Sequence, residues 1–454
     1  MTKMRTKLIL AVVTVLSLGV WLLGTSGVIQ ADFSSARDPG VRGGDPGAGG
    51  AIAGLTTDEN EMFVVGLEDF SENEDVPDGV GPRFNAPGCA FCHVTPATGG
   101  TSPAVNPLFQ LVDPLGEFKF TGNVVPSFIE RDGPIREARL QFNPDGSRDG
   151  GVHNLFVITG NPDAAGCNIK QEDFEKQIRN DNIIFRIPSP VFGAGLIEQI
   201  LDSTILANLA ADSSKKKDFG ISGRPNRNGN DGRISRFGWK AQNQSLLVFS
   251  AEAYNVEMGI TNQGFQIERD ETPSCQFATV PNDVVERVTL ISAIDNFANF
   301  QRFLAQPTPV SSFPGASASS INKGRQIFSN IGCALCHTPT LRTPDYTTTG
   351  ALAGQDANLF SDLALHNMGP GLADDILQGV AKGDEFRTSP LWGLGQRIFF
   401  LHDGRTTNLK VAIQAHKSSG SSKFGPSEAN KVIEKFNDLR DDDKQDLLNF
   451  LRSL

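Results

Sequence analysis

The sequence predicts a mainly α-helical protein in which two small helical domains carry long, loop-rich insertions. Two stretches, GCAFCHVTP at 88–96 and GCALCHTPT at 332–340, share one CxxCH pattern and indicate one structural unit used twice. The 47 glycines and 26 prolines favour ordered loops around compact helical parts over one regular sheet. With 454 residues, 39% of them hydrophobic, the chain is long enough for two or three domains with real cores.

The first 31 residues have the composition of a secretory signal peptide. Lys3, Arg5 and Lys7 give a positive start, an apolar run follows over 8–23, and small and polar residues continue to Ala31. The alternative is an uncleaved membrane anchor, but the apolar run is shorter than the roughly 20 residues that a spanning helix needs. We therefore expect residues 1–31 to be removed and the mature protein to be exported, to a bacterial periplasm.

Composition divides the rest of the chain into two domains. Residues 37–54 are Gly-rich and are typical of a flexible leader, and the stretch 306–320 is rich in Pro and Ser, as a linker is. We expect an N-terminal domain with a long insertion over 32–310 and a C-terminal domain over 311–454.

Hydrophobic periodicity predicts where the helices lie. The stretch 284–305 has the i, i+3, i+4 spacing of one long amphipathic helix. In the second domain, Ser320 is expected to cap a helix, and Thr406 or Thr407 to begin another. Two helices are expected to end the chain, one with an apolar face of Val432, Ile433, Phe436 and Leu439 and the other with Leu447, Leu448, Leu451 and Leu454; the segments 174–186 and 245–259 are shorter and only partly periodic.

The CxxCH motifs predict two covalently attached haems. Two thiols at this spacing can add to the two vinyl groups of a haem, and the adjacent His then reaches the iron as proximal ligand. A zinc site of four cysteines, or a redox-active CxxC, would leave the His after each pair unexplained. The residues expected to hold the first haem are Cys89, Cys92 and His93, and those for the second are Cys333, Cys336 and His337.

The two remaining cysteines are Cys167 and Cys275. In an oxidising compartment a leftover pair usually forms a disulfide, so we expect these two to be joined for a structural purpose. By the chain-entropy estimate, a loop of this length stabilises the fold by at most about 4–5 kcal/mol. The alternative is a reactive thiol pair.

The sixth ligand of each iron decides whether that iron only passes electrons or also binds a small oxidant. On the helix expected in 406–419, Leu409, Ala412, Ile413 and His416 share one face. A haem buried nearby that lacks a ligand favours His416 as that ligand over a satisfied core residue. The other candidates are His366 and Met368 for the same iron, His402 as a partner of backbone or of a haem propionate, and His153, which has no assigned role.

These motifs resemble those of the di-haem cytochrome c peroxidase superfamily and, within it, the di-haem oxidoreductases often labelled thiol oxidoreductase-like. In the peroxidases an HDG turn is followed, 14 residues after its His, by the distal ligand of the C-terminal haem. Here FLHDGR carries His402, and His416 stands 14 residues later. The peroxidases usually have Met at that place. Because the softer thioether favours ferrous iron, His416 should lower the reduction potential of this haem.

A second match is the stretch SRFGWKAQNQSLLVFSAEAYNVEMGIT at 235–261. It is similar to the peroxidase stretch in which a Trp lies between the haems and a Glu-Met-Gly carries the acid–base Glu. The resemblance implies these roles for Trp239 and Glu257, although the peroxidase Gln between them has no clear counterpart here. The runs 186–198 and 361–376 are typical of the oxidoreductase branch.

The resemblance also bears on the first iron and on calcium. The better-studied peroxidases bring a distal His to the N-terminal haem about 16 residues after its CxxCH, and that position is Phe109 here. No His lies between His93 and His153, so we expect an N-terminal haem that is open from the start. The family also implies a calcium ion between the domains, for which the Asn-rich stretch 226–232 offers oxygen ligands but few carboxylates.

The expected function is the reduction of hydrogen peroxide, or a related small oxidant, by an exported di-haem c-type cytochrome. Electrons would enter the C-terminal haem from a small redox protein or a quinone-linked donor and pass Trp239, and Glu257 would act as acid–base at the N-terminal haem. The alternatives are a pure electron-transfer cytochrome, with His153 or another group closing the first iron, and an oxygenase acting on an organic substrate. The net charge of −11 argues against nucleic acid as a partner. Nothing in the sequence indicates an oligomeric state.

Overall fold

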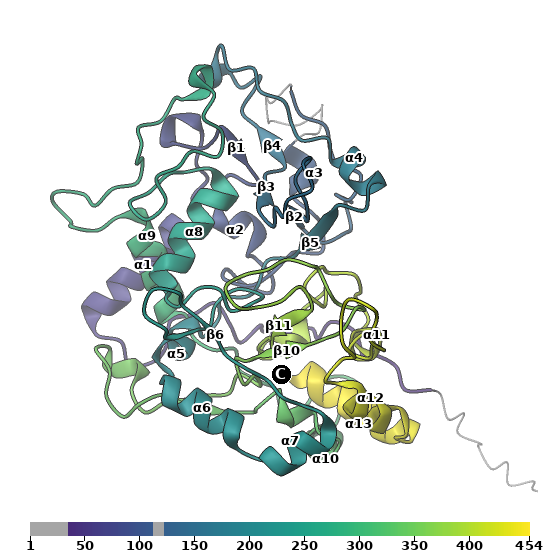
Figure 1. The fold of residues 1–454 in the computed structure, drawn as a ribbon. Helices are drawn as coiled ribbons and strands as arrows, with labels where there is room; N and C mark the ends of the chain where they lie inside the picture. Colours follow the sequence, from purple (N-terminus) through teal and green to yellow (C-terminus); the bar gives the residue numbers. More distant parts are fainter. Residues whose placement is uncertain (1–34, 112–121) are drawn as a thin grey trace, which may run out of the picture. The chain divides into compact units, whose positions relative to one another are not determined.

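Two pairs of long helices organise the protein, and each pair lies beside one CxxCH motif (Figure 1). The computed structural model describes residues 35–111 and 122–454. The helices are α1 (Thr57–Ser71), α2 (Cys89–Cys92), α3 (Leu108–Leu111), α4 (Phe174–Arg179), α5 (Ala194–Gln199), α6 (Asp202–Ala210), α7 (Ser213–Phe219), α8 (Leu246–Met258), α9 (Ala293–Phe303), α10 (Ala318–Asn330), α11 (Leu409–Gln414), α12 (Asn430–Asn437) and α13 (Asp441–Ser453). Helix α1 packs along α9 and contacts α2, which holds the first motif, whereas α10 packs along α13 and contacts the short helix η4 (Cys333–Leu335) of the second.

The strands are short and all pair antiparallel. They are β1 (Arg83–Phe84), β2 (Glu137–Leu140), β3 (Val152–His153), β4 (Phe156–Val157), β5 (Ile183–Arg186), β6 (Asn226–Arg227), β7 (Ile234–Ser235), β8 (Leu341–Arg342), β9 (Asp356–Ala357), β10 (Leu365–Asn367) and β11 (Glu385–Arg387). In the sheet β3-β2-β5, the register sets Glu137 opposite Arg186. More of the described residues therefore lie in helices than in strands, and many lie in loops. The predicted mainly helical class is thus only a coarse description of the fold.

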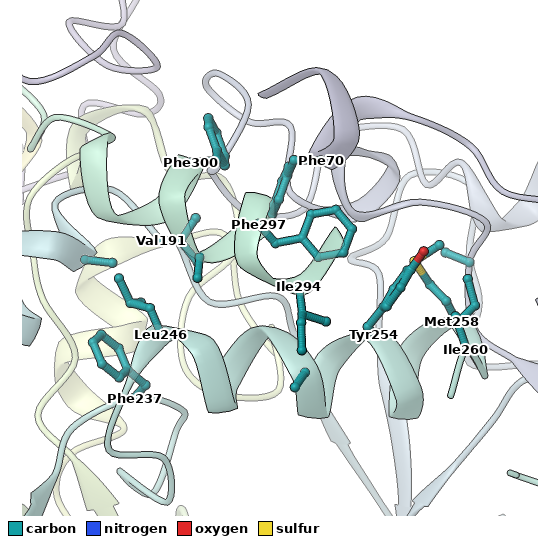
Figure 2. Close-up of a cluster of buried hydrophobic side chains, with 14 of the residues drawn as sticks. Phe70, Val191, Phe237, Leu246, Tyr254, Met258, Ile260, Ile294, Phe297 and Phe300 are labelled. Atoms are coloured by element: carbon teal, nitrogen blue, oxygen red, sulfur yellow. The ribbon is translucent and has the colours of Figure 1, made fainter. Parts of the chain in front are cut away.

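Aromatic packing holds the first helix pair together (Figure 2). Phe70 of α1 packs on Phe300 of α9 with ring centroids 4.7 Å apart. Tyr254 of α8 meets Phe297 edge-on at 5.0 Å, so α8 joins the same core. Edge-to-face and tilted ring pairs of this kind stabilise a core beyond the area that they bury. The result is a rigid wall of α1, α8 and α9 beside the first CxxCH motif.

Helix α8 begins and ends with clear caps, which fixes the position of its last turn. The side chain of Ser245 accepts a hydrogen bond from the backbone N–H of Val248. At the other end Gly259 is left-handed, with φ of 77°, and a Cβ there would come within 2.4 Å of the carbonyl oxygen of Gly81. Glycine is therefore required for α8 to end against the segment that precedes the first motif.

The expected helix over 284–305 is wrong in its first half. Helix α9 begins only at Ala293, because Ser292 and Asp295 form a reciprocal capping box. Leu290 has a left-handed φ of 59°, which an α-helix does not accommodate. The apolar spacing of 284–291 therefore reflects an extended loop that carries exposed side chains such as Val288.

Two expected helix starts in the second half of the chain are also wrong. Helix α10 is capped by Ser317, and the hydroxyl of Ser320 instead donates to Asp446 of α13 at 2.5 Å. Helix α11 is capped by Asn408 and is short, so the preceding threonines lie outside it. The expected final pair of helices is confirmed as α12 and α13.

The described residues 36–454 form one compact unit. The division into 32–310 and 311–454 stays a prediction. The expected signal peptide over 1–31 lies outside the described residues. Among the described residues, no helix has the length and apolar character needed to cross a membrane.

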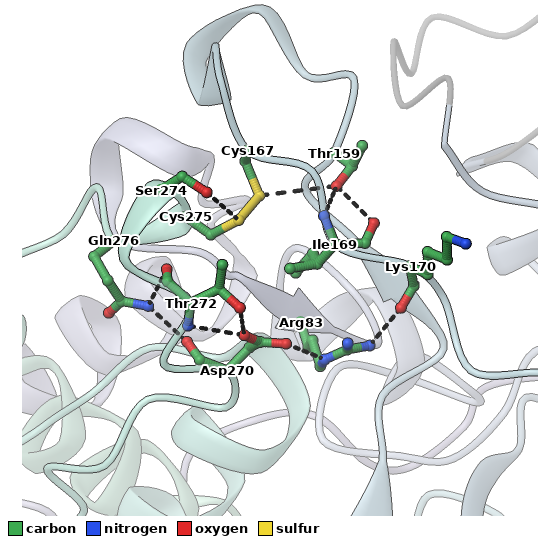
Figure 3. Close-up of a disulfide and its surroundings, with 10 residues drawn as sticks. All are labelled: Arg83, Thr159, Cys167, Ile169, Lys170, Asp270, Thr272, Ser274, Cys275 and Gln276. Carbon is green, nitrogen blue, oxygen red and sulfur yellow. Dashed lines mark hydrogen bonds and ion pairs between the residues drawn. A yellow bond between two sulfur atoms is a disulfide. The ribbon is translucent and has the colours of Figure 1, made fainter.

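A disulfide joins Cys167 and Cys275, the two cysteines outside the CxxCH motifs (Figure 3). Both are buried, and the segments that carry them are also held by Arg83, which donates to Asp270 at 2.9 Å and to the carbonyl oxygen of Lys170 at 3.0 Å. The loop that follows α8 is thereby tied back to the segment 159–170.

Candidate active site

The first CxxCH motif lines a cavity beneath α1, α8 and α9. Cys89 and Cys92 lie on the single turn of α2, and His93 follows as its C-cap. The His93 Nδ1–H donates to the carbonyl oxygen of Gly100 at 3.0 Å. Burial lowers the pKa of His93 to about 4, so the imidazole is neutral and its Nε2 is free to bind a metal.

The second CxxCH motif lines a second cavity, and there two histidines lie close together. Cys333, Cys336 and His337 line it, as does His416. His337 donates through Nδ1 to the carbonyl oxygen of Phe360 at 3.0 Å, and His416 donates through Nδ1 to that of Ala412 at 2.8 Å. Burial and then the neighbouring His416 lower the pKa of His337 to about 4. The Nδ1 hydrogen bonds thus leave the Nε2 atom of each ring available as a metal ligand.

The alternative ligands for the second iron differ in how well they are placed. His366 lines the cavity, but both its nitrogens are used, because Nε2 lies 2.9 Å from Asp362 and Nδ1 lies 2.8 Å from Glu428. Met368 does line the cavity. His402 also lines it, and burial lowers the pKa of His402 to about 4.

The first cavity contains one histidine. Of the described residues that line it, only His93 is a His. His153 lies on β3 outside the cavity, with its Nε2 2.8 Å from Asp149. Phe109, the position at which the better-studied peroxidases have a distal His, does not line the cavity, whereas its neighbour Leu108 does. The guanidinium carbon of Arg131 lies 4.9 Å from the ring centroid of Phe109. The expected open face of the first iron is compatible with this lining.

Glu257 lies in the last turn of α8 and lines the first cavity. Its Oε2 accepts a hydrogen bond of 2.9 Å from the amide of Asn85, and Glu137 lines the same cavity. Burial, followed by the charge of Glu137, raises the pKa of Glu257 well above that of an exposed carboxyl group. Sequence reasoning missed Asn85 and Glu137, since both come from segments far from Glu257 in the chain.

Trp239 lines both cavities. Its indole N–H donates to the carbonyl oxygen of Ile187 at 2.9 Å. On the side of the second cavity its ring meets His402 edge-on, with centroids 6.4 Å apart, and His402 stacks on Phe386 at 4.4 Å. A short run of aromatic rings therefore leads from the wall shared by the cavities into the second one.

A buried ion triad fixes the residue next to Trp239. Asp374 binds Arg186 at 2.7 Å and Lys240 at 3.0 Å, and the side chains of Lys240 and Asp374 are fully buried. The ammonium of Lys240 also lies 4.1 Å from the ring centroid of Phe386. The backbone N–H of Arg387 donates to the carbonyl oxygen of Trp239 at 2.9 Å. The side chain of Lys240 and the backbone of Trp239 are thus both anchored next to the indole.

Both cavities have the polar groups that a haem requires. In the first, Arg186 Nε, Gln242 Oε1 and Gln301 Oε1 are buried without a hydrogen-bond partner. In the second, burial lowers the pKa values of Arg387 and Arg397 to about 10, and neither guanidinium has a carboxylate partner among the described residues. Buried cations need anions, and the two propionates of a haem would supply them.

The structure bears on two other metal assignments. The CxxC pairs line separate cavities, so a zinc site built from all four cysteines is wrong. For calcium, Asn226 Oδ1 accepts from Arg227 and Val380, Asn228 Oδ1 accepts from Asn230, and Asp231 pairs with Arg233. These three side chains are thus engaged within the protein, and the described residues hold no cluster of three or more His, Cys, Asp or Glu suited to a metal ion. The calcium ion stays a prediction.

Comparison with solved structures gives distant similarities. A variant of the di-haem peroxidase BthA from Burkholderia thailandensis is 13% identical, with 92% of each chain covered and a TM-score of 0.39. A MauG-like protein associated with microbial copper homeostasis is 18% identical, with 59% of this chain and 90% of that chain covered and a TM-score of 0.29. Hydrazine synthase of Kuenenia stuttgartiensis is 16% identical, with 36% of this chain covered and a TM-score of 0.23; the match spans 55% of that chain. No curated protein matches the sequence.

The comparison with protein families is decisive. The model of the family described as "Di-haem oxidoreductase, putative peroxidase" matches residues 138–454. That match covers the second CxxCH motif, Trp239, Glu257 and His416, and it confirms the resemblance seen in the sequence. With a cavity at each CxxCH motif and a family match over most of its length, the chain belongs to the di-haem oxidoreductase family.

Proposed function

We propose that the protein is an exported di-haem c-type peroxidase that reduces hydrogen peroxide at the N-terminal haem. The observation that carries the proposal is the contrast between the cavities on either side of Trp239. The first offers one histidine and an acid, Glu257, whereas the second offers both His337 and His416, each with Nδ1 bound to backbone. An iron with one axial ligand can bind a small oxidant, and an iron with two passes electrons.

Haem attached at each motif supplies an iron that accepts and donates single electrons. In the first cavity, the hydrogen bond from His93 to Gly100 would hold the imidazole in place as the ligand of that iron. Arg136 and Arg186 line the same cavity and are suited to the propionates. Glu257 accepts a proton from bound peroxide and returns it to the leaving oxygen. Asn85 holds the carboxyl group in place for this transfer.

Electrons enter through the second cavity in this proposal. His337 and His416 hold that iron, and their two Nδ1–H hydrogen bonds to backbone keep both rings oriented. Trp239 and His402 provide the aromatic contact toward the first cavity. The donor is a small redox protein or a quinone-linked carrier of the periplasm.

The basic test is oxidation of a reduced donor by peroxide, which the protein with both haems should catalyse; no turnover with any donor would contradict the proposal.

The first prediction concerns the ligand of the second iron. Replacement of His416 by Met should keep a low-spin haem but raise its reduction potential, because a thioether favours ferrous iron. Replacement by Ala should make this haem high-spin. Visible and electron paramagnetic resonance spectra with a redox titration measure both effects, and His153→Ala is the control that should change neither haem. A low-spin second haem in His416→Ala would point to Met368 instead.

The second prediction concerns the acid–base group. Glu257→Gln is nearly isosteric and should keep both haems and both spin states. Turnover of peroxide should fall by about 10²–10⁴-fold, the usual contribution of general acid–base catalysis. Glu268→Gln is a control, since Glu268 is a half-buried carboxyl group whose pKa burial also raises but which does not line the cavity. Steady-state rates equal to those of the parent would make Glu257 a structural residue.

The third prediction concerns electron transfer between the haems. Trp239→Phe removes the indole that lines both cavities and should slow the reoxidation of the C-terminal haem by peroxide, while peroxide still binds at the parental rate. Stopped-flow absorbance of the reduced protein separates the two steps. Trp392→Phe is the control, because Trp392 is buried but lines neither cavity. Equal transfer rates in both variants would exclude a role for Trp239.

A further inference from the structure

A buried tyrosine beside the first cavity has no part in the proposed function. Tyr254 lies on α8 one turn before Glu257, and only 5% of its surface is exposed. Its ring meets Phe297 edge-on with centroids 5.0 Å apart, and Phe297 lines the first cavity, as does Ala253, the residue before Tyr254. Figure 2 shows Tyr254 rising from α8 beside Phe297. The phenol ring is therefore separated from the first cavity by a single aromatic side chain.

The hydroxyl of Tyr254 has a carboxyl group as its hydrogen-bond partner. It donates to Glu74 Oε1 at 3.1 Å. The backbone N–H of Glu74 donates to the carbonyl oxygen of Pro87 at 2.8 Å, and a Cβ at Gly88 would come within 2.2 Å of the carbonyl oxygen of Glu72. The segment that carries Glu74 is thus packed against the two residues that precede the first CxxCH motif. Phenol and carboxyl group both have fixed positions beside that motif.

Glu74 is suited to accept and return a proton at neutral pH. Burial is the largest influence and raises the pKa of Glu74 to about 7; the charges of Glu72, Asp78 and Asp69 act in the same direction, and the hydrogen bond from Tyr254 opposes them. Glu74 is only half-buried, and its neighbours in the chain are exposed, so solvent can exchange protons with it. A base whose pKa lies near the working pH is the most effective one.

The phenol, by contrast, keeps its proton until it loses an electron. Burial, followed by the charge of Glu74, raises the pKa of Tyr254. A phenol that has lost an electron is a strong acid, so its oxidation is favoured where a base lies within about 2.6–3.2 Å of its oxygen. The hydrogen bond to Glu74 meets that condition. Tyr254 is thus arranged to lose an electron and a proton together.

We propose that Tyr254 and Glu74 form a redox-active pair that gives one electron to the first iron when the second haem is not reduced. The proposal rests on the proposed function, because peroxide must first oxidise that iron. The electron leaves the phenol for the iron, the phenol O–H bond breaks, and its proton forms an O–H bond on Glu74 Oε1. Tyr254 remains as a neutral phenoxyl radical. A one-electron reductant in solution then returns the electron, and Glu74 returns the proton.

The pair lies outside the route that passes Trp239. Trp239 lines both cavities, whereas Tyr254 lines neither and is joined to the first through Phe297 alone. The half-buried Glu74 places the other end of the pair at the surface. Oxidising equivalents can therefore leave the first haem on a side that does not involve the second.

The test uses the fully oxidised protein with both haems, mixed with hydrogen peroxide in the absence of a donor. Electron paramagnetic resonance of samples frozen at successive times should show an organic radical, which narrows in protein grown with ring-deuterated tyrosine. The chain has two tyrosines, and the other, Tyr346, is 85% exposed. The tyrosine signal should be lost in Tyr254→Phe and should persist in the control Tyr346→Phe.

A second pair of variants tests the base. Glu74→Gln still offers an oxygen to the hydroxyl of Tyr254 but cannot take its proton, so the tyrosine signal should be lost although the tyrosine is present. Glu72→Gln removes an exposed negative charge two residues away and should keep the signal. Visible absorbance measures haem content in every variant. Under excess peroxide without a donor, Tyr254→Phe and Glu74→Gln should both lose haem absorbance faster than the parent.

The outcomes separate this proposal from the proposed function. A tyrosine signal that survives Tyr254→Phe or Glu74→Gln, or a first haem that peroxide oxidises without any tyrosine radical, overturns the pair and leaves the peroxidase function standing. A radical at Tyr254 in a protein that turns over no donor supports the pair and overturns the peroxidase function. A first haem whose spectrum does not respond to peroxide overturns both.

Discussion

The buried salt bridges of Asp374 hold the centre of the molecule together. Its carboxylate binds Arg186 and Lys240, and these three side chains are almost completely removed from solvent. Removing one partner of such a group would leave a buried charge uncompensated, at a cost of about 3–5 kcal/mol. Lys240 follows Trp239 in the chain, and Arg186 lines the first cavity. The triad therefore fixes the indole and one wall of the first cavity at the same time.

The two cavities differ in their chemistry although their CxxCH motifs are nearly identical. In each, the histidine of the motif donates through Nδ1 to a backbone carbonyl, and burial keeps it neutral. The difference lies in what else lines each cavity. The second also holds another neutral histidine, His416, and the first holds a carboxyl group, Glu257, whose pKa burial raises. Under the proposed function, this contrast assigns electron entry to one iron and peroxide to the other.

Sequence reasoning identified the residues whose signal is local. Each CxxCH motif is recognised by its spacing, and Trp239 and Glu257 come from one continuous stretch. His416 was selected from an expected helical face, although α11 ends at Gln414 and His416 lies in the turn that follows. Helix starts were less reliable, since Ser292 and Asn408 cap their helices through hydrogen bonds that periodicity does not reveal. The hydrogen bond from Asn85 to Glu257, and the burial of Arg387 and Arg397 without a carboxylate partner among the described residues, depend on contacts between distant segments. No spacing within the chain predicts those contacts.

The account depends most directly on one iron being open and the other closed. An electron paramagnetic resonance spectrum of the purified, oxidised protein with both haems tests this. The cavity linings predict one high-spin ferric signal from the haem held by His93 and one low-spin signal from the haem held by His337 and His416. Two low-spin signals would contradict the account, because both irons would then be closed and the protein would only transfer electrons.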